Sequence, residues 1–323
     1  MNANTVSPVT RLAPSPTGWL HLGHARSFLV AWWYSRKLLG SVKLRMDDLD
    51  APRVQQKFVD GVLEDLHWLG LDWDGPTLFE SKSVPAYMQR ANQLQKKGDA
   101  YPCTCSRGEI QAAISAPHAS DPKVRVYPGT CRTRFPSVEA AEQVTGKLAG
   151  LRFRPATGHV HFVDLFAGPA SQDVAKECGD FLIVRRDKVP CYHLAVVVSD
   201  DHQGITHVIR GDDLLDSTPR QLRLCESLGL RPPRHLHIPL VVNEAGKRLA
   251  KRSDSLSLRD LRESGVSSAA LVRWIAHSVG IDVSSNSTFT ASEYVTRFEL
   301  ARLASSPLTV DEHQLPLQLR SVS

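Results

Sequence analysis

The order of apolar and polar positions divides the first hundred residues into short strands and longer helices. Val9 to Ala13 are predicted to form a short buried strand. The spacing of apolar residues from Leu22 onward predicts a helix that ends near Gly40. The pattern then predicts a strand over 42–46, an amphipathic helix over 55–69 and another helix over 84–97.

The rest of the chain continues this pattern with more strands. Short strands are predicted over 152–154, 159–162 and 181–184, and a turn over 187–190. The long apolar run from Cys191 to Asp201 favours a strand buried on both faces. After it we expect strands over 205–209 and 235–242, two short helices within 260–279, and one helix over 291–303.

Composition adds limits to this picture. The 323 residues are enough for two domains, and 42% hydrophobic with 23% charged residues is ordinary for a soluble globular protein. A net charge of +5 permits a nucleic-acid partner without requiring one. No signal region or membrane-spanning run is visible, and six cysteines in such a chain favour thiols or metal ligands over disulfides. We therefore expect a cytoplasmic, monomeric protein with no membrane contact.

The loop between the first strand and the first helix carries the clearest candidate chemistry. Pro14, Pro16 and Gly18 punctuate the loop, and it ends at a helix N-terminus, where unpaired N–H groups attract anions. His21 and His24 stand at this point and are able to donate hydrogen bonds to phosphate. The sequence is not a P-loop, because it has no Gly-Lys-Ser/Thr. The simpler alternative is a pair of histidines that caps the helix.

Three cysteines form a candidate metal site. Cys103, Cys105 and Cys131 supply three thiolates, whereas a closed structural zinc site takes four ligands. The fourth ligand could be His118, Asp121 or Tyr127, and residue type alone favours His118 because histidine is a common zinc ligand. The alternative is three buried thiols that pack as small hydrophobic groups.

Other charged residues follow predicted strands. Asp47 comes directly after the second strand, and Arg210 follows the strand over 205–209, where it could pair with a carboxylate. A basic loop from Lys247 to Arg252 follows the last strand, and taken alone it could be a solvated turn.

These motifs together resemble one known family. Arg11-Leu12-Ala13-Pro14-Ser15-Pro16-Thr17-Gly18 followed by His21-Leu22-Gly23-His24 resembles the signature of class I aminoacyl-tRNA synthetases of the glutamyl branch. The basic loop is similar to their second signature, with Lys251 matching the lysine that contacts ATP, whereas Arg248 and Ala250 depart from the pattern. At position 47 the family carries glutamate, so Asp47 is one methylene shorter.

The resemblance implies an α/β fold: a Rossmann-like, doubly wound parallel sheet with a zinc-containing insertion and a short helical C-terminal region. The implied divisions are the first half of the catalytic domain over 1–97, the acceptor-type insertion over 98–190, the second catalytic half over 191–255 and a helical stem-contact-like region over 256–323. We expect no anticodon-binding domain.

The resemblance also assigns site residues. It implies that ATP is bound by His21, Gly23, His24 and Lys251, and that His21, His24 and Lys251 are catalytic. It implies that glutamate is bound by Arg11, Leu12, Ala13, Pro14, Ser15, Asp47, Tyr192 and Arg210. It implies one structural zinc ion on Cys103, Cys105, Tyr127 and Cys131, with magnesium accompanying ATP.

Three functions are consistent with this resemblance. The chain is most similar to glutamyl-Q tRNA(Asp) synthetases, which activate L-glutamate with ATP and transfer it to queuosine at the wobble position of tRNA(Asp). The missing anticodon-binding region, the zinc pattern, and Val196 where glutamyl enzymes have asparagine favour this function. The alternatives are a shortened glutamyl-tRNA synthetase that charges tRNA(Glu), and a catalytically silent paralogue that binds glutamate or RNA. A silent paralogue should have lost His21, His24 and Lys251, yet all three are present.

Overall fold

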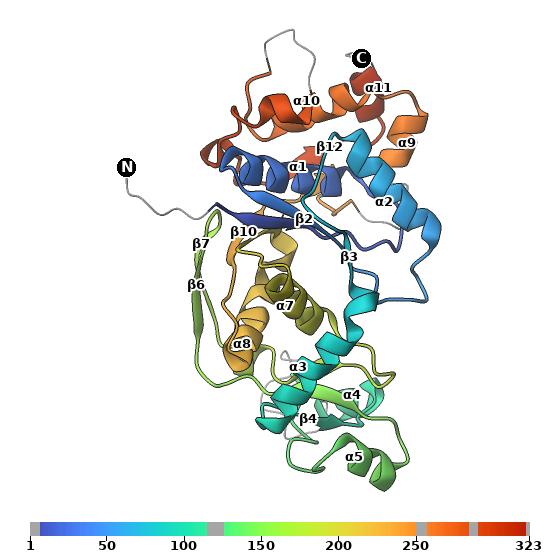
Figure 1. Ribbon diagram of the computed structural model, residues 1–323, viewed down its shortest axis with the longest axis vertical. Helices are drawn as coiled ribbons and strands as arrows, with labels where there is room; N and C mark the ends of the chain where they lie inside the picture. The colour runs from blue at the N-terminus through green and yellow to red at the C-terminus, as the bar shows by residue number, and fades with distance from the viewer. Residues whose placement is uncertain (1–6, 115–125, 250–256, 284–289, 321–323) are drawn as a thin grey trace.

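Parallel strands form the centre of the molecule, which is shown in Figure 1 as a computed structural model. The structure describes residues 7–114, 126–249, 257–283 and 290–320. Strands β1 (Val9–Leu12), β2 (Ser41–Met46) and β3 (Leu78–Phe79) pair in that order, and β9 (His207–Gly211) pairs with β10 (Arg234–Ile238). The amide of Val9 donates to Thr206 Oγ1 at 2.8 Å, and the amide of Thr206 donates to the Val9 carbonyl at 2.9 Å. These two bonds place the segment entering β9 beside β1.

Three of the expected helices are confirmed around these strands: α1 (Leu22–Lys37), α2 (Gln56–Trp68) and α3 (Val84–Lys96). The largest buried cluster joins apolar residues of α1, α2 and strands β1, β2, β9 and β10. It also includes α9 (Leu258–Glu263) and α10 (Ser268–Ser278), which confirm the two short helices expected within 260–279. In Figure 1 these two helices lie at the upper end of the molecule, above α1.

Below the parallel strands lies a smaller antiparallel sheet, ordered β4 (Ala100–Cys103), β5 (Gly150–Phe153) and β8 (Phe181–Val184). Three short helices accompany it, α4 (Arg107–Ile114), α5 (Val138–Thr145) and α6 (Val174–Glu177). A second buried cluster joins β5 and β8 to α3, α7 (Tyr192–His202) and α8 (Thr218–Leu228). The divisions predicted at residues 97 and 190 stay predictions.

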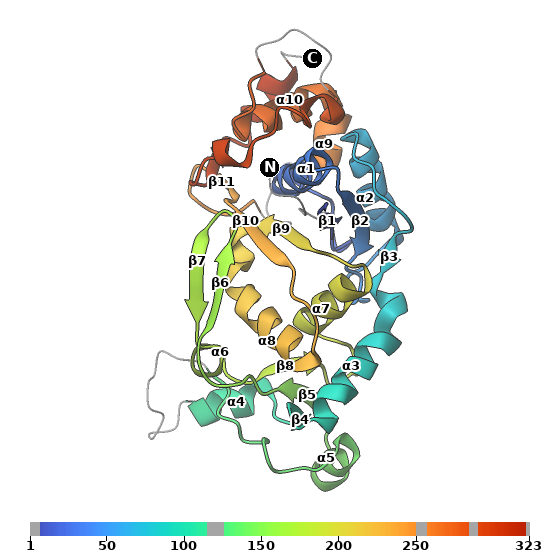
Figure 2. The ribbon, with the colours of Figure 1, turned by 60° about the vertical axis from the view of Figure 1, so that its left-hand side comes forward.

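A hairpin of β6 (Val160–Asp164) and β7 (Gly168–Gln172) runs from the antiparallel sheet up to the parallel strands. Figures 1 and 2 both show it beside α8 with its upper end at β10, and the amide of Leu165 donates to the carbonyl of His235 at 2.9 Å. The hairpin therefore connects the region of the predicted insertion to the parallel strands.

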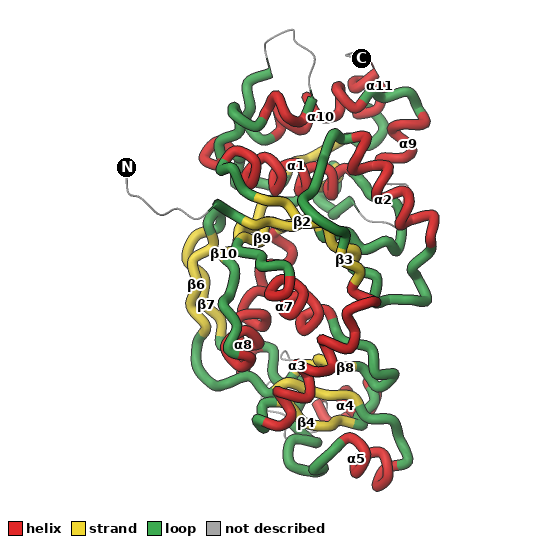
Figure 3. The backbone as a smooth tube through the Cα atoms, in the orientation of Figure 1, coloured by secondary structure: helices red, strands yellow, loops and turns green. Residues whose placement is uncertain are grey.

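Three sequence predictions are wrong. The apolar run after Cys191 is the helix α7, not a strand, because this helix is buried on nearly every side and shows no amphipathic period (Figure 3). The segment 291–303 forms two 3₁₀ turns, η3 (Ala291–Tyr294) and η4 (Leu300–Arg302), instead of one α-helix. The strand expected over 235–242 is divided at Pro239 and Leu240 into β10 and β11 (Val241–Asn243).

The last described elements pack against β11 and the main core. β12 (Leu308–Val310) pairs in parallel with β11, and α11 (Leu315–Arg320) buries Leu315 and Leu319 in the main core. Within the described ranges, no helix is long and apolar enough to cross a membrane.

Candidate active site

A cavity of about 370 Å³ lies at the carboxyl ends of the parallel strands, in the size range of small-molecule sites. Open α/β sheets bind ligands at this edge. Most of the residues that the sequence assigned to glutamate or ATP line the cavity: Arg11, Ala13, Ser15, His21, Gly23, Asp47, Tyr192 and Arg210.

Three further assigned residues, Leu12, Pro14 and His24, do not line the cavity. Leu12 is fully buried in the main core, so only its backbone is able to serve the site. The carbonyl of Pro14 accepts a hydrogen bond from the amide of Asp47 at 2.9 Å, and it thereby fixes the loop against the end of β2. His24 lies beside His21, with ring centroids 3.8 Å apart. Lys251 lies outside the described residues.

His21 and His24 cap helix α1. The Nδ1 atom of His21 accepts from the amide of Gly23 at 3.1 Å, and Nδ1 of His24 accepts from the amide of His21 at 3.2 Å. A neutral imidazole whose Nδ1 accepts carries its proton on Nε2, so both rings have an Nε2–H donor. The capping alternative and the phosphate-binding prediction are therefore compatible, because the capping bonds involve only the Nδ1 atom of each ring.

Arg210 is a buried cation that contacts neutral groups. Its side chain donates to His237 Nε2 at 2.9 Å and Thr218 Oγ1 at 2.8 Å, and to the Leu214 carbonyl and Tyr192 Oη at longer range. No described carboxylate forms an ion pair with it, and burial lowers its pKa. Nη2 uses both of its protons on Thr218 Oγ1 and the Leu214 carbonyl, and Nη1 is the terminal nitrogen on the side of the Tyr192 hydroxyl.

A cluster of carboxyl groups surrounds Arg45, which also lines the cavity. Arg45 is completely buried and donates to Asp47 at 2.7 Å and to Asp200 at 2.5 Å, and Asp200 also lies 3.5 Å from Arg11. Glu80 Oε1 is 3.6 Å from Arg45 Nε but accepts no hydrogen bond from the described residues. Burial and the charge of Asp47 raise the pKa of Glu80 to about 9. We therefore place a proton on Glu80, which leaves two guanidiniums balanced by two aspartates.

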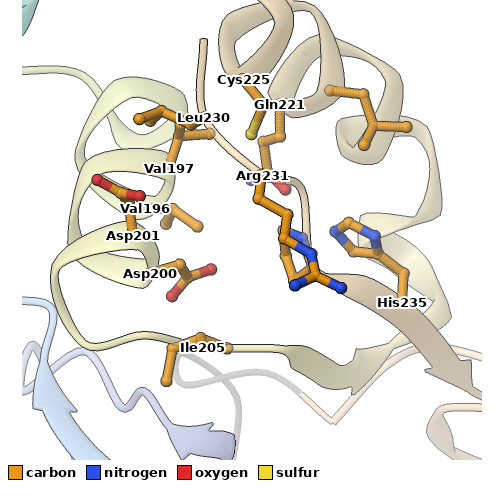
Figure 4. Close-up of a pocket in the computed structure, with 12 residues that line it drawn as sticks. Val196, Val197, Asp200, Asp201, Ile205, Gln221, Cys225, Leu230, Arg231 and His235 are labelled. Atoms are coloured by element: carbon orange, nitrogen blue, oxygen red, sulfur yellow. The ribbon is translucent and has the colours of Figure 1, made fainter. Parts of the chain in front are cut away.

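A second, much smaller cavity lies behind this cluster. Figure 4 shows Val196 and Asp200 on α7 facing Arg231 and His235 across it. Its volume of about 10 Å³ holds at most about one water molecule, which is too little for an amino acid. Val196 lines this cavity and not the larger one, so the family's asparagine position lies behind the pocket in this chain.

The described ends of the basic loop lie close to the large cavity. Arg248 lines the cavity and forms an ion pair with Asp213. Ser257 forms an isolated antiparallel β-bridge with His21, and the amide of Leu258 donates to the carbonyl of Leu20 at 2.8 Å. The loop carrying Lys251 therefore leaves and re-enters the described structure beside the cavity.

The three cysteines form a cluster far from this cavity. The sulfur atoms of Cys103, Cys105 and Cys131 lie within 4.8 Å of one another, and none is in a disulfide. Tyr127 Oη is 3.4 Å from the sulfurs of Cys103 and Cys105, and it accepts from the amide of Cys131 at 3.0 Å. His118 and Asp121 lie outside the described residues. Three sulfurs and one neighbouring phenolic oxygen provide four candidate ligands, the number that a closed zinc site takes.

The family described as "tRNA synthetases class I (E and Q), catalytic domain" matches residues 8–317, nearly the whole chain. The chain belongs to this family. The match also identifies the catalytic fold as that of class I synthetases with mixed α/β content, as the sequence motifs predicted, and such synthetases are ligases.

Individual relatives agree with this assignment. A protein of Rhodopirellula baltica named "Glutamyl-Q tRNA(Asp) synthetase" is 40% identical over 95% of this chain and 97% of its own length. A "Glutamate--tRNA ligase" of Burkholderia multivorans is 38% identical over 95% of this chain, but this chain spans only 65% of that protein. A solved glutamate tRNA ligase of Elizabethkingia meningosepticum has the same fold, with a TM-score of 0.80, 24% identity, and coverage of 96% of this chain and 68% of that chain.

Several residues at the site were not predicted from the sequence. Five such residues interact with a predicted site residue, either directly or through one neighbour: Asp200, Glu80, Thr218, Asp164 and His237. One available signal was a pair of histidines, at 235 and 237, inside an otherwise apolar strand. Their partners lie far away in the sequence, so the signal indicates burial of polar groups but not what they bind.

Proposed function

We propose that this protein activates L-glutamate with ATP in the absence of tRNA and transfers it to queuosine at the wobble position of tRNA(Asp). The observation that carries the proposal is the mixed charge of the residues that line the cavity. Arg210 with Tyr192 offers donors to the side-chain carboxylate, Arg11 adds a second cation, and Asp47 suits the α-ammonium group. The name of the Rhodopirellula relative, which matches over almost its full length, supports the choice of acceptor.

The chemical step needs positioning and charge stabilisation. An oxygen of the glutamate α-carboxylate attacks the α-phosphorus of ATP, the bond to pyrophosphate breaks, and glutamyl-adenylate forms. The carboxylate is already ionised at neutral pH, so no general base is required. His21, His24 and the N-terminus of α1 are placed to stabilise phosphate charge, and Lys251 is proposed to add a cation. Magnesium accompanies ATP.

Transfer then uses a hydroxyl of the queuosine cyclopentene diol. Its oxygen attacks the acyl carbon, AMP leaves, and the hydroxyl proton is released. The diol is chemically equivalent to the terminal ribose diol that a conventional synthetase acylates. A single-stranded anticodon loop is able to present its base to a cavity, as RNA recognition commonly requires.

The decisive experiment follows labelled glutamate. We expect glutamate-dependent ATP–pyrophosphate exchange without RNA, and stable labelling of queuosine-containing tRNA(Asp) but not of the same tRNA with guanosine. Oxidation restricted to the 3′-terminal ribose should leave labelling intact. Efficient charging of tRNA(Glu) would identify a conventional glutamyl-tRNA synthetase, and absence of exchange would favour a silent paralogue.

We also propose a structural zinc ion on Cys103, Cys105, Tyr127 and Cys131. The donor set supports it, and Arg152 donates a hydrogen bond to the sulfur of Cys103 at 3.3 Å. Metal analysis should find about one zinc per chain. Cys105→Ser should lose the metal, whereas the control Cys178→Ser, outside the cluster, should keep it. Tyr127→Phe should weaken zinc binding more than His118→Ala; the reverse order would assign the fourth position to His118.

A further inference from the structure

A buried aspartate and histidine stand behind the guanidinium of Arg210. Asp164 Oδ2 and His237 Nδ1 are 2.6 Å apart, and both side chains have no exposed surface. Asp164 ends β6 in the hairpin, His237 lies in β10, and Arg210 lies in β9. Neither Asp164 nor His237 lines the cavity, so any effect on a ligand must pass through another residue.

The surroundings of Asp164 fix its charge. Its Oδ1 accepts hydrogen bonds from the amides of Phe166 at 3.0 Å, Ala167 at 2.8 Å and His237 at 3.1 Å. Burial raises the pKa of Asp164, but the hydrogen bonds from His237 and the amides outweigh it and lower the pKa. An ionised carboxylate only accepts hydrogen bonds, so the proton of the short contact lies on Nδ1 of His237.

This proton position determines the other side of the ring. Burial lowers the pKa of His237 and nearby Arg210 lowers it further, so the imidazole is neutral. With the proton on Nδ1, Nε2 has a lone pair, and that lone pair accepts from Arg210 Nε at 2.9 Å. The opposite tautomer would direct an N–H at the N–H of Arg210. Asp164 therefore selects the tautomer that Arg210 requires.

The remaining contacts complete the orientation of the guanidinium. Nη2 of Arg210 is held by Thr218 Oγ1 and the Leu214 carbonyl, which leaves Nη1 on the side of Tyr192 and the cavity. The bond at Nε fixes the rotation about the last side-chain torsions. Without it, a buried guanidinium that has no ion-pair partner among the described residues would be free to turn toward nearby acceptors.

We propose that Asp164 and His237 are positioning residues that hold Arg210 in the orientation that receives the substrate's side-chain carboxylate. The inference rests on the proposed function, and it gives the β6–β7 hairpin a role in amino-acid recognition. Because the Leu165 amide also binds the His235 carbonyl, the hairpin is tied to β10 at the aspartate and at the residue after it.

The test is Asp164→Asn, which keeps the shape of the side chain. The amide oxygen continues to accept from the three backbone amides, and the NH₂ group donates to Nδ1 and forces the proton of His237 onto Nε2. We expect the KM for glutamate in ATP–pyrophosphate exchange to rise about 10- to 100-fold, the size expected for loss of a hydrogen bond to a charged group. The KM for ATP should stay within about twofold.

Variants at position 237 separate positioning from folding. In His237→Gln, the amide oxygen reaches the place of Nε2 and keeps an acceptor for Arg210, so the KM for glutamate should stay within about threefold of the unmodified protein. His237→Leu removes the acceptor, and it should raise the KM for glutamate as Asp164→Asn does. Adding Asp164→Asn to His237→Gln should have little further effect, because glutamine has no tautomer to invert.

These outcomes distinguish the inference from the proposed function. Absence of glutamate-dependent exchange in the unmodified protein would refute the function itself. Normal exchange with an unchanged glutamate KM in Asp164→Asn would overturn the inference, as would equal defects for ATP and glutamate. If Asp164→Asn does not fold, as judged by circular dichroism and thermal unfolding, the glutamine and leucine variants of His237 decide by the same criterion.

Discussion

Two buried arginines that line the same cavity have contrasting surroundings. Arg45 has three carboxyl groups within ion-pair distance, and these raise its pKa well above the ordinary value although burial lowers it. Arg210 has a histidine, a threonine, a carbonyl and a tyrosine as partners, and burial lowers its pKa. The charge of Arg45 is thus neutralised by neighbouring carboxylates, whereas no described carboxylate forms an ion pair with Arg210.

Arg45 is thus a structural cation, whereas Arg210 is the cation that we propose to pair with the substrate. A buried charge without a counter-ion is costly, so a protein retains one where the counter-ion arrives from outside. The neutral shell of Arg210 supplies orientation without cancelling its charge. The carboxylates around Arg45 hold the ends of β2 and α7 together, and Asp47 still faces the cavity.

The largest expected effect is on stability, from Arg45→Gln. This change leaves Asp47 and Asp200 buried without their main partner, and breaking such a pair costs about 3–5 kcal/mol. Thermal unfolding should show a decrease in Tm of roughly 10 °C in a chain of this size. The control Arg36→Gln, at an exposed pair of aspartates, should cost no more than about 1 kcal/mol. Equal shifts in the two variants would contradict the contrast between buried and exposed pairs.

The next effect is on activity, from Arg210→Gln. We expect kcat/KM for glutamate to fall about 10²- to 10³-fold, because the neutral side chain cannot pair with a carboxylate. The Tm should change by only a few degrees, since no described ion pair is broken. Pyrophosphate exchange and thermal unfolding measure the two quantities, with Arg234→Gln at the exposed start of β10 as the control. A large fall in Tm with unchanged glutamate kinetics would exchange the roles given to Arg45 and Arg210.

The smallest effect concerns the pH dependence of stability and Glu80. Its pKa of about 9 in the folded protein exceeds the value of about 4.3 in an unfolded chain. The folded state therefore binds more protons than the unfolded state between these values, and stability falls as the pH rises through that window. Glu80→Gln should remove this loss, so that the variant gains stability relative to the unmodified protein at pH 9 and changes little at pH 4. Denaturant unfolding across that range checks it, and a destabilised variant at pH 9 would show that Glu80 is ionised in the fold.

Local sequence patterns predicted most elements near the site. The N-terminal strand, the loop with His21 and His24, and helices α1, α2 and α3 follow from apolar spacing and cap residues. Helix α7 did not, because Leu194 to Val198 are five consecutive buried apolar residues, three of them β-branched valines. A helix buried on all sides and a strand buried on both faces give the same continuous run, and periodicity does not separate them.

The sequence predicted those site residues that lie in recognisable motifs. It did not predict those whose contacts are with residues far away in the sequence. Arg11, His21, Tyr192 and Arg210 are brought together as the motifs suggested. Asp164 and His237 are 73 residues apart, and each looks like an ordinary member of its strand. Sequence spacing contains no information about such a pairing until the hairpin and β10 are known to meet.

The hydrogen bonds between Val9 and Thr206 have a consequence for how the chain folds during synthesis. The two residues are 197 positions apart, yet they join the edge of β1 to the entry of β9. On a ribosome, one edge of the first strand stays without this neighbour until more than 200 residues have been made, which takes about 10 s or more at 5–20 residues per second. An exposed strand edge is a template for wrong pairing. Nascent chains stalled before residue 206 should therefore be the most aggregation-prone stage of this protein's synthesis.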